Sequence, residues 1–217
     1  MVYKDKVYAL PFRGSGWYVY YNKNLFDEAK IPYPTGKWTW AEYRDMAKKL
    51  TKGEGAEKVW GSFWPDWPGP WQMMFNQAGG VVIKDDYTTD IVSNPKFKEG
   101  LEYKYNLTMA DKTQPTVAEN KATNAHYRAA FLTGKVAMVI SGEWFPEMLA
   151  TAKNKGELKF NWGLTRLPCD EAEYSSQGLA TRVIIHSKTK NQDAAFKFLS
   201  YFTGTDGEMV VAGKGTM

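Results

Sequence analysis

Five consecutive apolar residues lead into a polar turn in the stretch Val136-Ala137-Met138-Val139-Ile140-Ser141-Gly142-Glu143-Trp144. An uninterrupted apolar run of this length is typical of a strand that is buried on both faces of a sheet. The residues after the turn, including Met148 and Leu149, have the pattern of a helix. A buried strand that leads directly into a helix is the unit from which α/β domains are built.

Strand and helix patterns alternate along the rest of the chain. Strands are predicted over residues 7–10, 17–21, 59–63, 160–167 and 181–185, with a turn at residues 13–16. Helices are predicted over residues 23–29, 39–52, 70–79, 95–107, 123–134, 193–202 and 206–212. Three helix starts are marked by Asn22, by the Thr39–Glu42 capping box and by Asn94 before Pro95. The alternation predicts an α/β fold, in which ligands bind outside the carboxyl ends of the strands.

An aromatic loop follows the strand predicted over residues 59–63. It reads Phe63-Trp64-Pro65-Asp66-Trp67-Pro68-Gly69-Pro70-Trp71. Proline is excluded from helix interiors and cannot donate to a strand ladder, so the loop is predicted to be rigid. Tryptophan rings exposed on a rigid loop form a platform on which the C–H face of a pyranose can stack. The alternative is that the tryptophans plug a small local core, and the loop by itself leaves both interpretations open.

The composition is that of a folded protein with a binding role. The 217 residues suffice for one large domain or two small lobes with a sizeable core. Hydrophobic residues make up 43%, which excludes a disordered chain, and the aromatic share of 15% favours ligand binding. The net charge of +4 is spread without a basic block, so no nucleic-acid partner is expected.

The sequence contains no catalytic or metal-binding motif that we recognise. His126 and His186 lack the spacing of metal ligands, and the single cysteine, Cys169, is expected to be a packing or surface residue. Phosphate loops, dinucleotide fingerprints and nucleophile elbows are absent. We therefore expect no enzymatic activity and no cofactor. No apolar run reaches 18 residues and no secretion signal is seen, which leaves an intracellular protein or one whose start has been cut away.

A series of short segments spans nearly the whole chain in a characteristic order. They are Tyr8-Ala9-Leu10-Pro11, Tyr20-Tyr21-Asn22-Lys23-Asn24-Leu25-Phe26, Trp38-Thr39-Trp40-Ala41-Glu42, Gln77-Ala78-Gly79-Gly80, Ala130-Phe131-Leu132-Thr133-Gly134-Lys135-Val136-Ala137-Met138, Gly142-Glu143-Trp144 and Ala194-Ala195-Phe196-Lys197-Phe198-Leu199. Together they resemble the bacterial extracellular solute-binding proteins of sugar-type ABC importers, the family of maltose-binding protein. No single segment is diagnostic, and the resemblance rests on the ordered series.

The resemblance implies a periplasmic-binding-protein-like (type II) α/β fold, in which two lobes joined by hinge crossings clamp the ligand. By this comparison, residues 1–13 are a hinge strand, residues 14–177 form the second lobe and residues 178–217 return to the first lobe. The family's secretion signal, most of its first lobe and its closing helices have no counterpart in this sequence. We therefore interpret the chain as a fragment, mainly the second lobe plus part of the first.

The resemblance also suggests a set of ligand-binding residues. Trp144 matches the stacking aromatic residue of a Gly-x-Trp turn, and Trp64, Asp66 and Trp67 lie in a loop that matches a ligand-contacting region. The full candidate set is Trp144, Trp64, Trp67, Asp66, Glu143, Arg13, Ser15, Trp17, Gln177 and Gly178. Trp38 and Trp40 are expected to be structural because the helix-start pattern explains them, and Trp60 and Trp162 are expected to lie in the core because they fall in strand patterns. We expect Trp144 and at least one of Trp64 and Trp67 to line one concave surface.

The implied function is capture of a sugar, of oligosaccharide size, and its delivery to the membrane subunits of an ABC permease. The full-length protein would be extracytoplasmic, either periplasmic or lipid-anchored at the outer face of the cell membrane. One alternative is a glycoside hydrolase or carbohydrate-binding module, for which Asp66 and Glu143 are the carboxylate pair to consider. The other alternative is a structural fragment that binds no ligand.

The helix predicted over residues 193–202 carries an apolar stripe. Its members are Ala194, Ala195, Phe198, Leu199 and Phe202. In the family this stripe packs on the sheet of the first lobe, most of which has no counterpart here. We expect an apolar patch at this end of the chain, covered by self-association with a second copy or by refolding of the tail.

Overall fold

The computed structural model describes residues 2–67, 72–84, 86–89, 91–122, 126–170 and 178–213. The chain divides into two compact units. The first, here called the ribbon unit, comprises Met1–Gly16, Gly142–Met148 and Gly178–Met217. The second, here called the sheet unit, comprises Trp17–Ser141 and Leu149–Gln177. The lobe boundaries expected from the sequence, at residues 13/14 and 177/178, stay a prediction.

The sheet unit is built on the strand order β5-β4-β6 among the described residues. The central strand β4 (Trp17–Asn22) runs antiparallel to β6 (Trp162–Arg166), with Tyr20 opposite Leu164. The flanking strand β5 (Met138–Gly142) is buried along its whole length, which confirms the apolar strand predicted there. Residues 59–63 add two parallel bridges, Trp60 to Val136 and Phe63 to Val139. The mixed sheet with surrounding helices confirms the α/β class.

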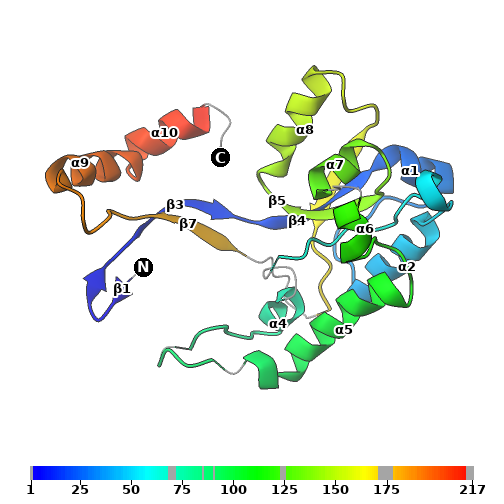
Figure 1. Cartoon of the computed structure of the whole chain (residues 1–217), viewed down its shortest axis with the longest axis horizontal. Helices are drawn as coiled ribbons and strands as arrows, with labels where there is room; N and C mark the ends of the chain where they lie inside the picture. The colour runs from blue at the N-terminus through cyan, green and yellow to red at the C-terminus, as the bar shows by residue number, and fades with distance from the viewer. Residues whose placement is uncertain are drawn as a thin grey trace. The chain divides into compact units, whose positions relative to one another are not determined.

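Seven described helices surround this sheet. They are α1 (Lys23–Ala29), α2 (Trp40–Leu50), α4 (Met73–Gln77), α5 (Pro95–Met109), α6 (Val117–Ala122), α7 (Tyr127–Leu132) and α8 (Phe145–Asn154). Short 3-10 turns occur at η1 (Gly55–Glu57) and η2 (Ile91–Ser93). Helices α2 and α5 lie on one side of the sheet and α8 on the other (Figure 1).

The helix starts that the sequence predicted are confirmed by their capping hydrogen bonds. The Asn22 side chain accepts from the main-chain N–H groups of Asn24 and Leu25 at 3.0 and 3.3 Å. Thr39 and Glu42 form the reciprocal capping box of α2, and the Asn94 side chain accepts from the N–H of Lys96. Each cap satisfies backbone donors that the first helical turn leaves without partners.

An aromatic cluster forms the core beneath the tryptophan loop. Trp40 stacks on Trp64 with ring centroids 5.1 Å apart and an interplanar angle of 7°. Tyr103 meets both rings edge-on, and its hydroxyl donates to the Trp40 carbonyl at 2.6 Å. Burial raises the pKa of the Tyr103 phenol. Trp38 and Trp40 are both buried, which confirms their structural role.

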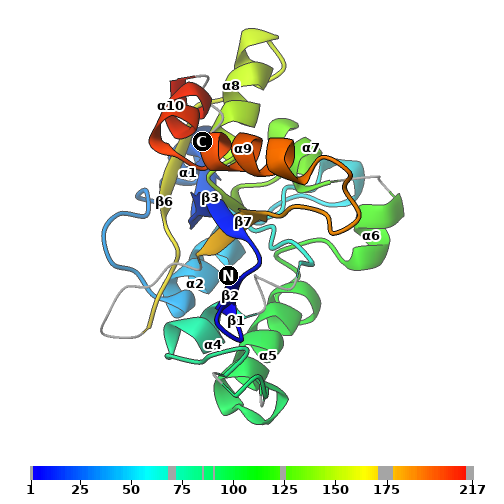
Figure 2. The same ribbon diagram turned by 90° about the vertical axis from the view of Figure 1, so that its left-hand side faces the viewer.

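The ribbon unit contains two antiparallel strand pairs, the first turn of α8 and two further helices among its described residues. Strand β1 (Val2–Tyr3) pairs with β2 (Lys6–Val7), and β3 (Leu10–Ser15) pairs with β7 (Leu179–Val183). Helices α9 (Gln192–Phe202) and α10 (Thr205–Gly213) follow β7. Figure 2 shows α9 crossing over the β3–β7 ribbon, and the rings of Phe12 and Phe202 stack there with centroids 4.8 Å apart.

The structure corrects three predictions about local structure. The turn expected at residues 13–16 is wrong, because β3 continues to Ser15 and pairs Arg13 and Gly14 with β7. Helix α6 has no counterpart among the predicted helices. Trp60 and Trp162 are half-buried rather than enclosed in the core. The predicted helix starts near residues 70–71 and 123–124 lie outside the described residues.

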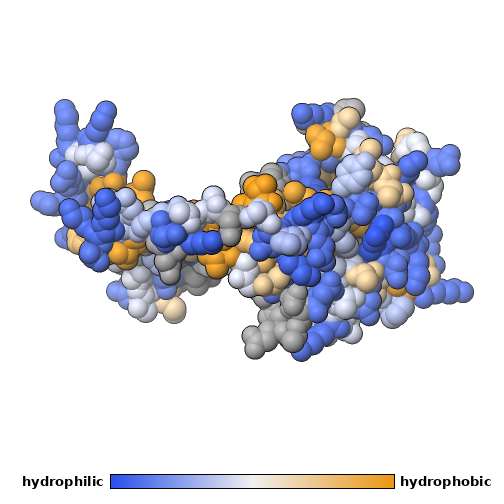
Figure 3. Space-filling model, turned by 90° about the horizontal axis from the view of Figure 1, so that it is seen from below, coloured by the Kyte–Doolittle hydropathy of each residue, from blue (hydrophilic) through white to orange (hydrophobic). Residues whose placement is uncertain are grey.

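The apolar stripe of α9 is not enclosed. No residue of α9 is buried, and Phe196 and Phe198 are 62% and 66% exposed. Apolar surface of the ribbon unit is visible at the left of Figure 3. The apolar patch expected at this end of the chain is therefore present. That a second copy of the chain or the refolded tail covers it stays a prediction.

Two further properties follow from the described residues. In that part of the chain, no helix is both long enough and apolar enough to cross a bilayer. Over the same residues, no three His, Cys, Asp or Glu side chains gather in a way that could hold a metal ion. Cys169 is buried, as expected for a packing residue.

Candidate functional site

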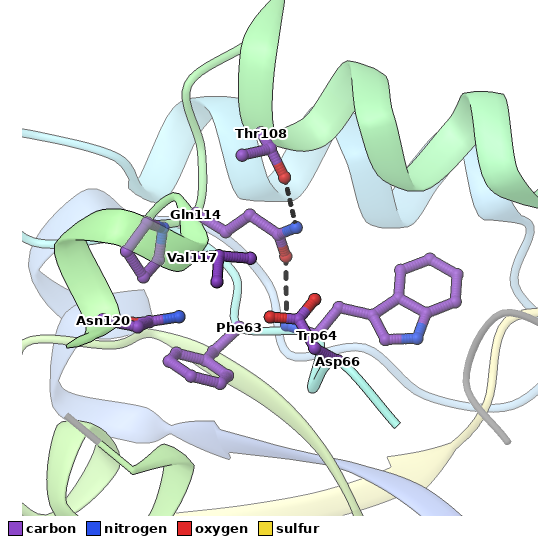
Figure 4. Close-up of a pocket in the computed structure, with 8 residues that line it drawn as sticks. Phe63, Trp64, Asp66, Thr108, Gln114, Val117 and Asn120 are labelled. Carbon is purple, nitrogen blue, oxygen red and sulfur yellow. Dashed lines mark hydrogen bonds between the residues drawn. The ribbon is translucent and has the colours of Figure 1, made fainter. Parts of the chain in front are cut away.

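A hollow in the sheet unit lies beside the aromatic loop and is here called the Trp67 hollow. Its volume is about 390 Å³, and its lining residues are Phe63, Pro65, Asp66, Trp67, Val117, Asn120, Lys121, His126 and Tyr127. A smaller cavity of about 30 Å³ adjoins it and shares Phe63, Asp66, Val117 and Asn120 (Figure 4). The hollow thus combines several aromatic rings with a carboxylate, an amide and an ammonium group.

Trp67 is held in this hollow by two neighbouring rings. Its ring meets Trp17 edge-on at a centroid distance of 5.8 Å and Tyr127 at 5.0 Å. Trp17 is itself buried on β4, so it supports Trp67 from the core side. The Trp67 ring remains partly exposed. A partly exposed indole fixed by edge contacts can offer a face to a ligand at little entropic cost.

Asp66 presents a carboxylate at the rim of the hollow. The ammonium group of Lys104 forms an ion pair with it and also donates to the Pro65 carbonyl at 3.3 Å. The Asp66 side chain is half-exposed, whereas that of Lys104 is largely covered. Lys104 therefore fixes both the loop and the carboxylate, whose remaining lone pairs can accept hydrogen bonds from a ligand.

Helix α6 supplies the opposite wall of the hollow. Its start is a capping box, in which the N–H and hydroxyl of Thr116 donate to the Glu119 carboxylate at 2.7 and 2.8 Å. These bonds lower the pKa of Glu119. The cap fixes the first turn of α6 and with it Asn120 and Lys121, which line the hollow.

Gln114 connects the loop to helix α5. Its Oε1 accepts from the main-chain N–H of Trp64 at 3.0 Å, and its Nε2 donates to Thr108 Oγ1 at 2.6 Å (Figure 4). Trp64 itself is only 3% exposed, with one ring face covered by Trp40. Its position matches the alternative weighed from the sequence, in which a loop tryptophan plugs a local core.

The other candidate residues that the structure describes belong to the ribbon unit. Arg13 and Glu143 form an ion pair at 3.5 Å, and Ser15 is buried. Trp144 follows Glu143 and is half-buried, whereas Gly178 is exposed and directly precedes β7. Gln177 lies outside the described residues.

The structure therefore brings the candidate residues together in two groups. Trp17, Trp64, Asp66 and Trp67 lie together in the sheet unit. The ribbon unit holds Arg13, Ser15, Glu143, Trp144 and Gly178. That Trp144 shares one concave surface with Trp67 stays a prediction.

Outside the aromatic loop, sequence reasoning missed five residues of the hollow. They are Val117, Asn120, Lys121, His126 and Tyr127. Tyr127 lies in the helix predicted over residues 123–134, and its ring meets Trp67 edge-on. The Thr116–Glu119 capping box was the available signal for α6, because Ser/Thr followed three residues later by Glu marks a helix start.

The sequence pattern of the bacterial extracellular solute-binding proteins matches residues 1–209. The chain belongs to this family. Its members are solute-binding proteins rather than enzymes, and the solved structures similar to this chain have the type II periplasmic-binding fold expected from the sequence.

Among the curated relatives of this chain are two proteins named for the sugars that they bind. The maltotriose-binding protein of Pyrococcus abyssi is 25% identical over 96% of this chain and 42% of its own length. The maltooligosaccharide ABC transporter solute-binding lipoprotein of Streptococcus pneumoniae is 23% identical over 96% of this chain and 48% of its own length. The chain thus spans about half the length of the curated relatives it matches.

Solved structures similar to this chain are also solute-binding proteins of transporters, and the chain again matches about half of each. A sugar transporter protein of Rhizobium etli, in an open conformation, is 32% identical with a TM-score of 0.78 and covers 98% of this chain and 53% of its own. An ABC substrate-binding protein of Listeria monocytogenes in complex with cycloalternan is 26% identical with a TM-score of 0.80, over 95% and 50% of the two chains. A Thermotoga lettingae solute-binding protein bound to α-D-tagatose is 25% identical with a TM-score of 0.77. The match covers 99% of this chain and 54% of that protein.

Proposed function

We propose that this solute-binding chain takes part in capturing a carbohydrate for an ABC importer. The observation that carries the proposal is the Trp67 hollow, where a partly exposed indole stands beside the Asp66–Lys104 pair and Asn120. A volume of about 390 Å³ lies within the range of small-molecule sites. Membership in the family supports the same function.

Sugar recognition needs two kinds of contact, and the hollow offers both. The C–H face of a pyranose packs against an aromatic ring, which Trp67 provides with Tyr127 and His126 beside it. The hydroxyl groups at the edge of the sugar both donate and accept hydrogen bonds. Asp66 can accept from them, and Asn120 and Lys121 bring an amide and an ammonium donor.

The candidate residues of the ribbon unit would supply further contacts to the sugar. Trp144 is a half-buried aromatic residue at the carboxyl end of β5, where α/β folds place their ligands. Arg13, Ser15, Glu143, Gln177 and Gly178 stay candidate ligand-binding residues, whereas Trp17 is buried and supports Trp67 from the core side.

The ligand class that we favour is an oligosaccharide. Two relatives are named for maltotriose and maltooligosaccharides, and one similar structure holds cycloalternan. The same relatives, one of which is a lipoprotein of an ABC transporter, support the proposed delivery to an ABC permease at the outer face of the cell membrane. No bond of the sugar is made or broken in this function.

A saccharide screen tests the proposal. The chain is titrated with maltose, maltotriose, a maltooligosaccharide, cycloalternan and tagatose, using thermal shift and then calorimetry. We expect at least one saccharide to raise the melting temperature as its concentration increases. Trp67→Ala should weaken its affinity by about tenfold, or ~1.4 kcal/mol, because a stacking surface is lost.

Trp60→Ala is the matched control. Trp60 is also half-buried in the sheet unit, but its ring carries the ammonium group of Lys58 at 3.8 Å and lines a different cavity. We expect this variant to keep the wild-type affinity. The proposal fails if no saccharide binds, or if Trp67→Ala binds as tightly as the wild type.

A further inference from the structure

Glu143 is bonded to Gly16 through both its side chain and its main chain. Its Oε2 accepts from the N–H of Gly16 at 3.3 Å, and its own N–H donates to the Gly16 carbonyl at 3.2 Å. Both polar groups of Gly16 are thereby paired with one residue. These bonds tie the end of β3 to the turn that follows β5.

The second oxygen of Glu143 faces Arg13. The Arg13 Nε atom lies 3.5 Å from Glu143 Oε1, with the two side chains 19% and 30% exposed. This Nε is buried and makes no hydrogen bond among the described residues. A covered guanidinium nitrogen without a hydrogen bond depends on a nearby anion, and the Glu143 carboxylate is that anion.

The Trp144 ring depends on the main chain of the same turn. A Cβ atom placed on Gly142 would lie 2.1 Å from Cζ3 of Trp144, so the ring lies directly over the α-carbon of Gly142. Only glycine permits this close approach. The ring position is therefore set by the turn from Gly142 to Trp144, whose middle residue is Glu143.

We propose that Arg13 and Glu143 are positioning residues for Trp144. The carboxylate bridges Arg13 and Gly16, holds the turn after β5 in one conformation and so fixes the indole ring. With its two oxygens facing Arg13 and Gly16, Glu143 acts on the ligand through Trp144, and the double-mutant cycle below separates this role from direct contact. The effect on ligand binding rests on the proposed function, whereas the effect on the ring does not.

The first test needs no ligand. The chain is labelled with 5-fluorotryptophan, and the ¹⁹F resonance of Trp144 is assigned with Trp144→Phe. Glu143→Ala should shift or broaden this resonance. Glu143→Gln should change it less, because the amide oxygen still accepts from Gly16, and Arg13→Met should also disturb it. Thermal melts confirm that each variant is folded.

Glu147→Ala is the matched control for this test. Glu147 is an exposed acid in the first turn of α8, four residues after Glu143, and has the same charge. It should leave the Trp144 resonance unchanged. The proposal is overturned if Glu143→Ala leaves the resonance unchanged in a folded protein, or if Glu147→Ala disturbs it equally.

The second test is a double-mutant cycle with the saccharide that the wild-type chain binds. Glu143→Ala should weaken affinity about fivefold in the wild-type background. It should have no further effect in the Trp144→Ala background, because the ring on which it acts is absent. An equal loss in both backgrounds would mean direct ligand contact and would overturn the inference. Failure of all saccharides to bind would count against the proposed function, and the ¹⁹F result would still decide the positioning role.

Discussion

Asp111 is a carboxylate held by two cations of one helix. Its side chain is only 7% exposed. Arg44 Nη2 donates to Oδ1 at 2.9 Å, Arg44 Nε bonds to Oδ2, and Lys48 Nζ lies 3.3 Å from Oδ1. Because Arg44 and Lys48 lie on α2 and Asp111 follows α5, the group ties these two helices together.

We expect Asp111→Ala to lower the free energy of unfolding at pH 7 by about 2–3 kcal/mol, as loss of one partner leaves a covered charge uncompensated. The expected loss of unfolding free energy is smaller than for a fully buried ion pair, because the Arg44 side chain is about one-third exposed and solvent screens its charge. Urea denaturation measures it. Glu28→Ala removes the exposed ion pair with Lys52 and should cost under about 0.5 kcal/mol. Equal losses for the two variants would contradict this prediction.

The contribution of Asp111 should also depend on pH. The hydrogen bond from Arg44 lowers the pKa of Asp111 in the folded state. In the unfolded chain, the pKa of this carboxyl group is about 4. Above that pH the folded state receives the full stabilisation from the lowered pKa, and the stabilisation is lost as the pH falls through the pKa of the folded state. The difference in unfolding free energy between the wild type and Asp111→Ala should therefore shrink below about pH 4. A difference that stays constant down to pH 2.5 would show that the ion pair is not its source.

At the scale of elements, two capping boxes of the same type serve helices of different length. Thr39 and Glu42 cap the eleven-residue α2, and Thr116 and Glu119 cap the six-residue α6. A helix of six residues cannot persist on its own hydrogen bonds, so its cap and its packing decide whether it forms. Helix α6 carries Asn120 and Lys121 of the Trp67 hollow.

Thr116→Ala should therefore affect the site more than Thr39→Ala. Each variant should cost about 1 kcal/mol of stability through the lost cap. We expect faster hydrogen exchange in α6 and weaker saccharide binding for Thr116→Ala. For Thr39→Ala, we expect faster exchange at the start of α2 with unchanged binding. If both variants bind the saccharide as the wild type does, α6 does not contribute to the site.

At the scale of the whole molecule, the ribbon unit exposes large apolar side chains. Phe196 and Phe198 stand on α9, and Met209 and Val210 are exposed on α10. Exposed apolar surface of this kind promotes association, because each covered side chain gains free energy from leaving water. Figure 3 shows such surface on this unit.

We expect the chain to self-associate as its concentration rises. The double variant Phe196→Ser with Phe198→Ser should sediment more slowly at high concentration, with stability unchanged within about 0.5 kcal/mol because both residues are exposed. Val92→Ser is the control, since Val92 is also strongly exposed but lies in the sheet unit. Wild-type protein that sediments as a monomer at every concentration would refute the expected association.

Sequence reasoning predicted the elements whose signals are local. The Asn22, Thr39 and Asn94 caps are confirmed because each is made by bonds within two or three residues. The buried strand β5 is confirmed because a run of apolar side chains cannot remain in water. The turn expected at residues 13–16 is wrong, because pairing with β7 extends β3 through Arg13 and Gly14. That partner is about 165 residues away, beyond the reach of local patterns.

For the loop residues Trp64 and Trp67, the sequence predicted the loop but not which of the two rings is exposed. The sequence by itself determined that Trp64 and Trp67 stand on a proline-rich loop after a strand, as loop chemistry depends on adjacent residues. Only the tertiary structure decided which indole is exposed. Trp64 stacks on Trp40 and binds Gln114, 50 residues away, so its ring is buried. Trp67 meets Trp17 and Tyr127 in edge-on arrangements and keeps part of its surface exposed. Burial is set by partners that the fold brings together from distant positions, and no pattern within the loop encodes them.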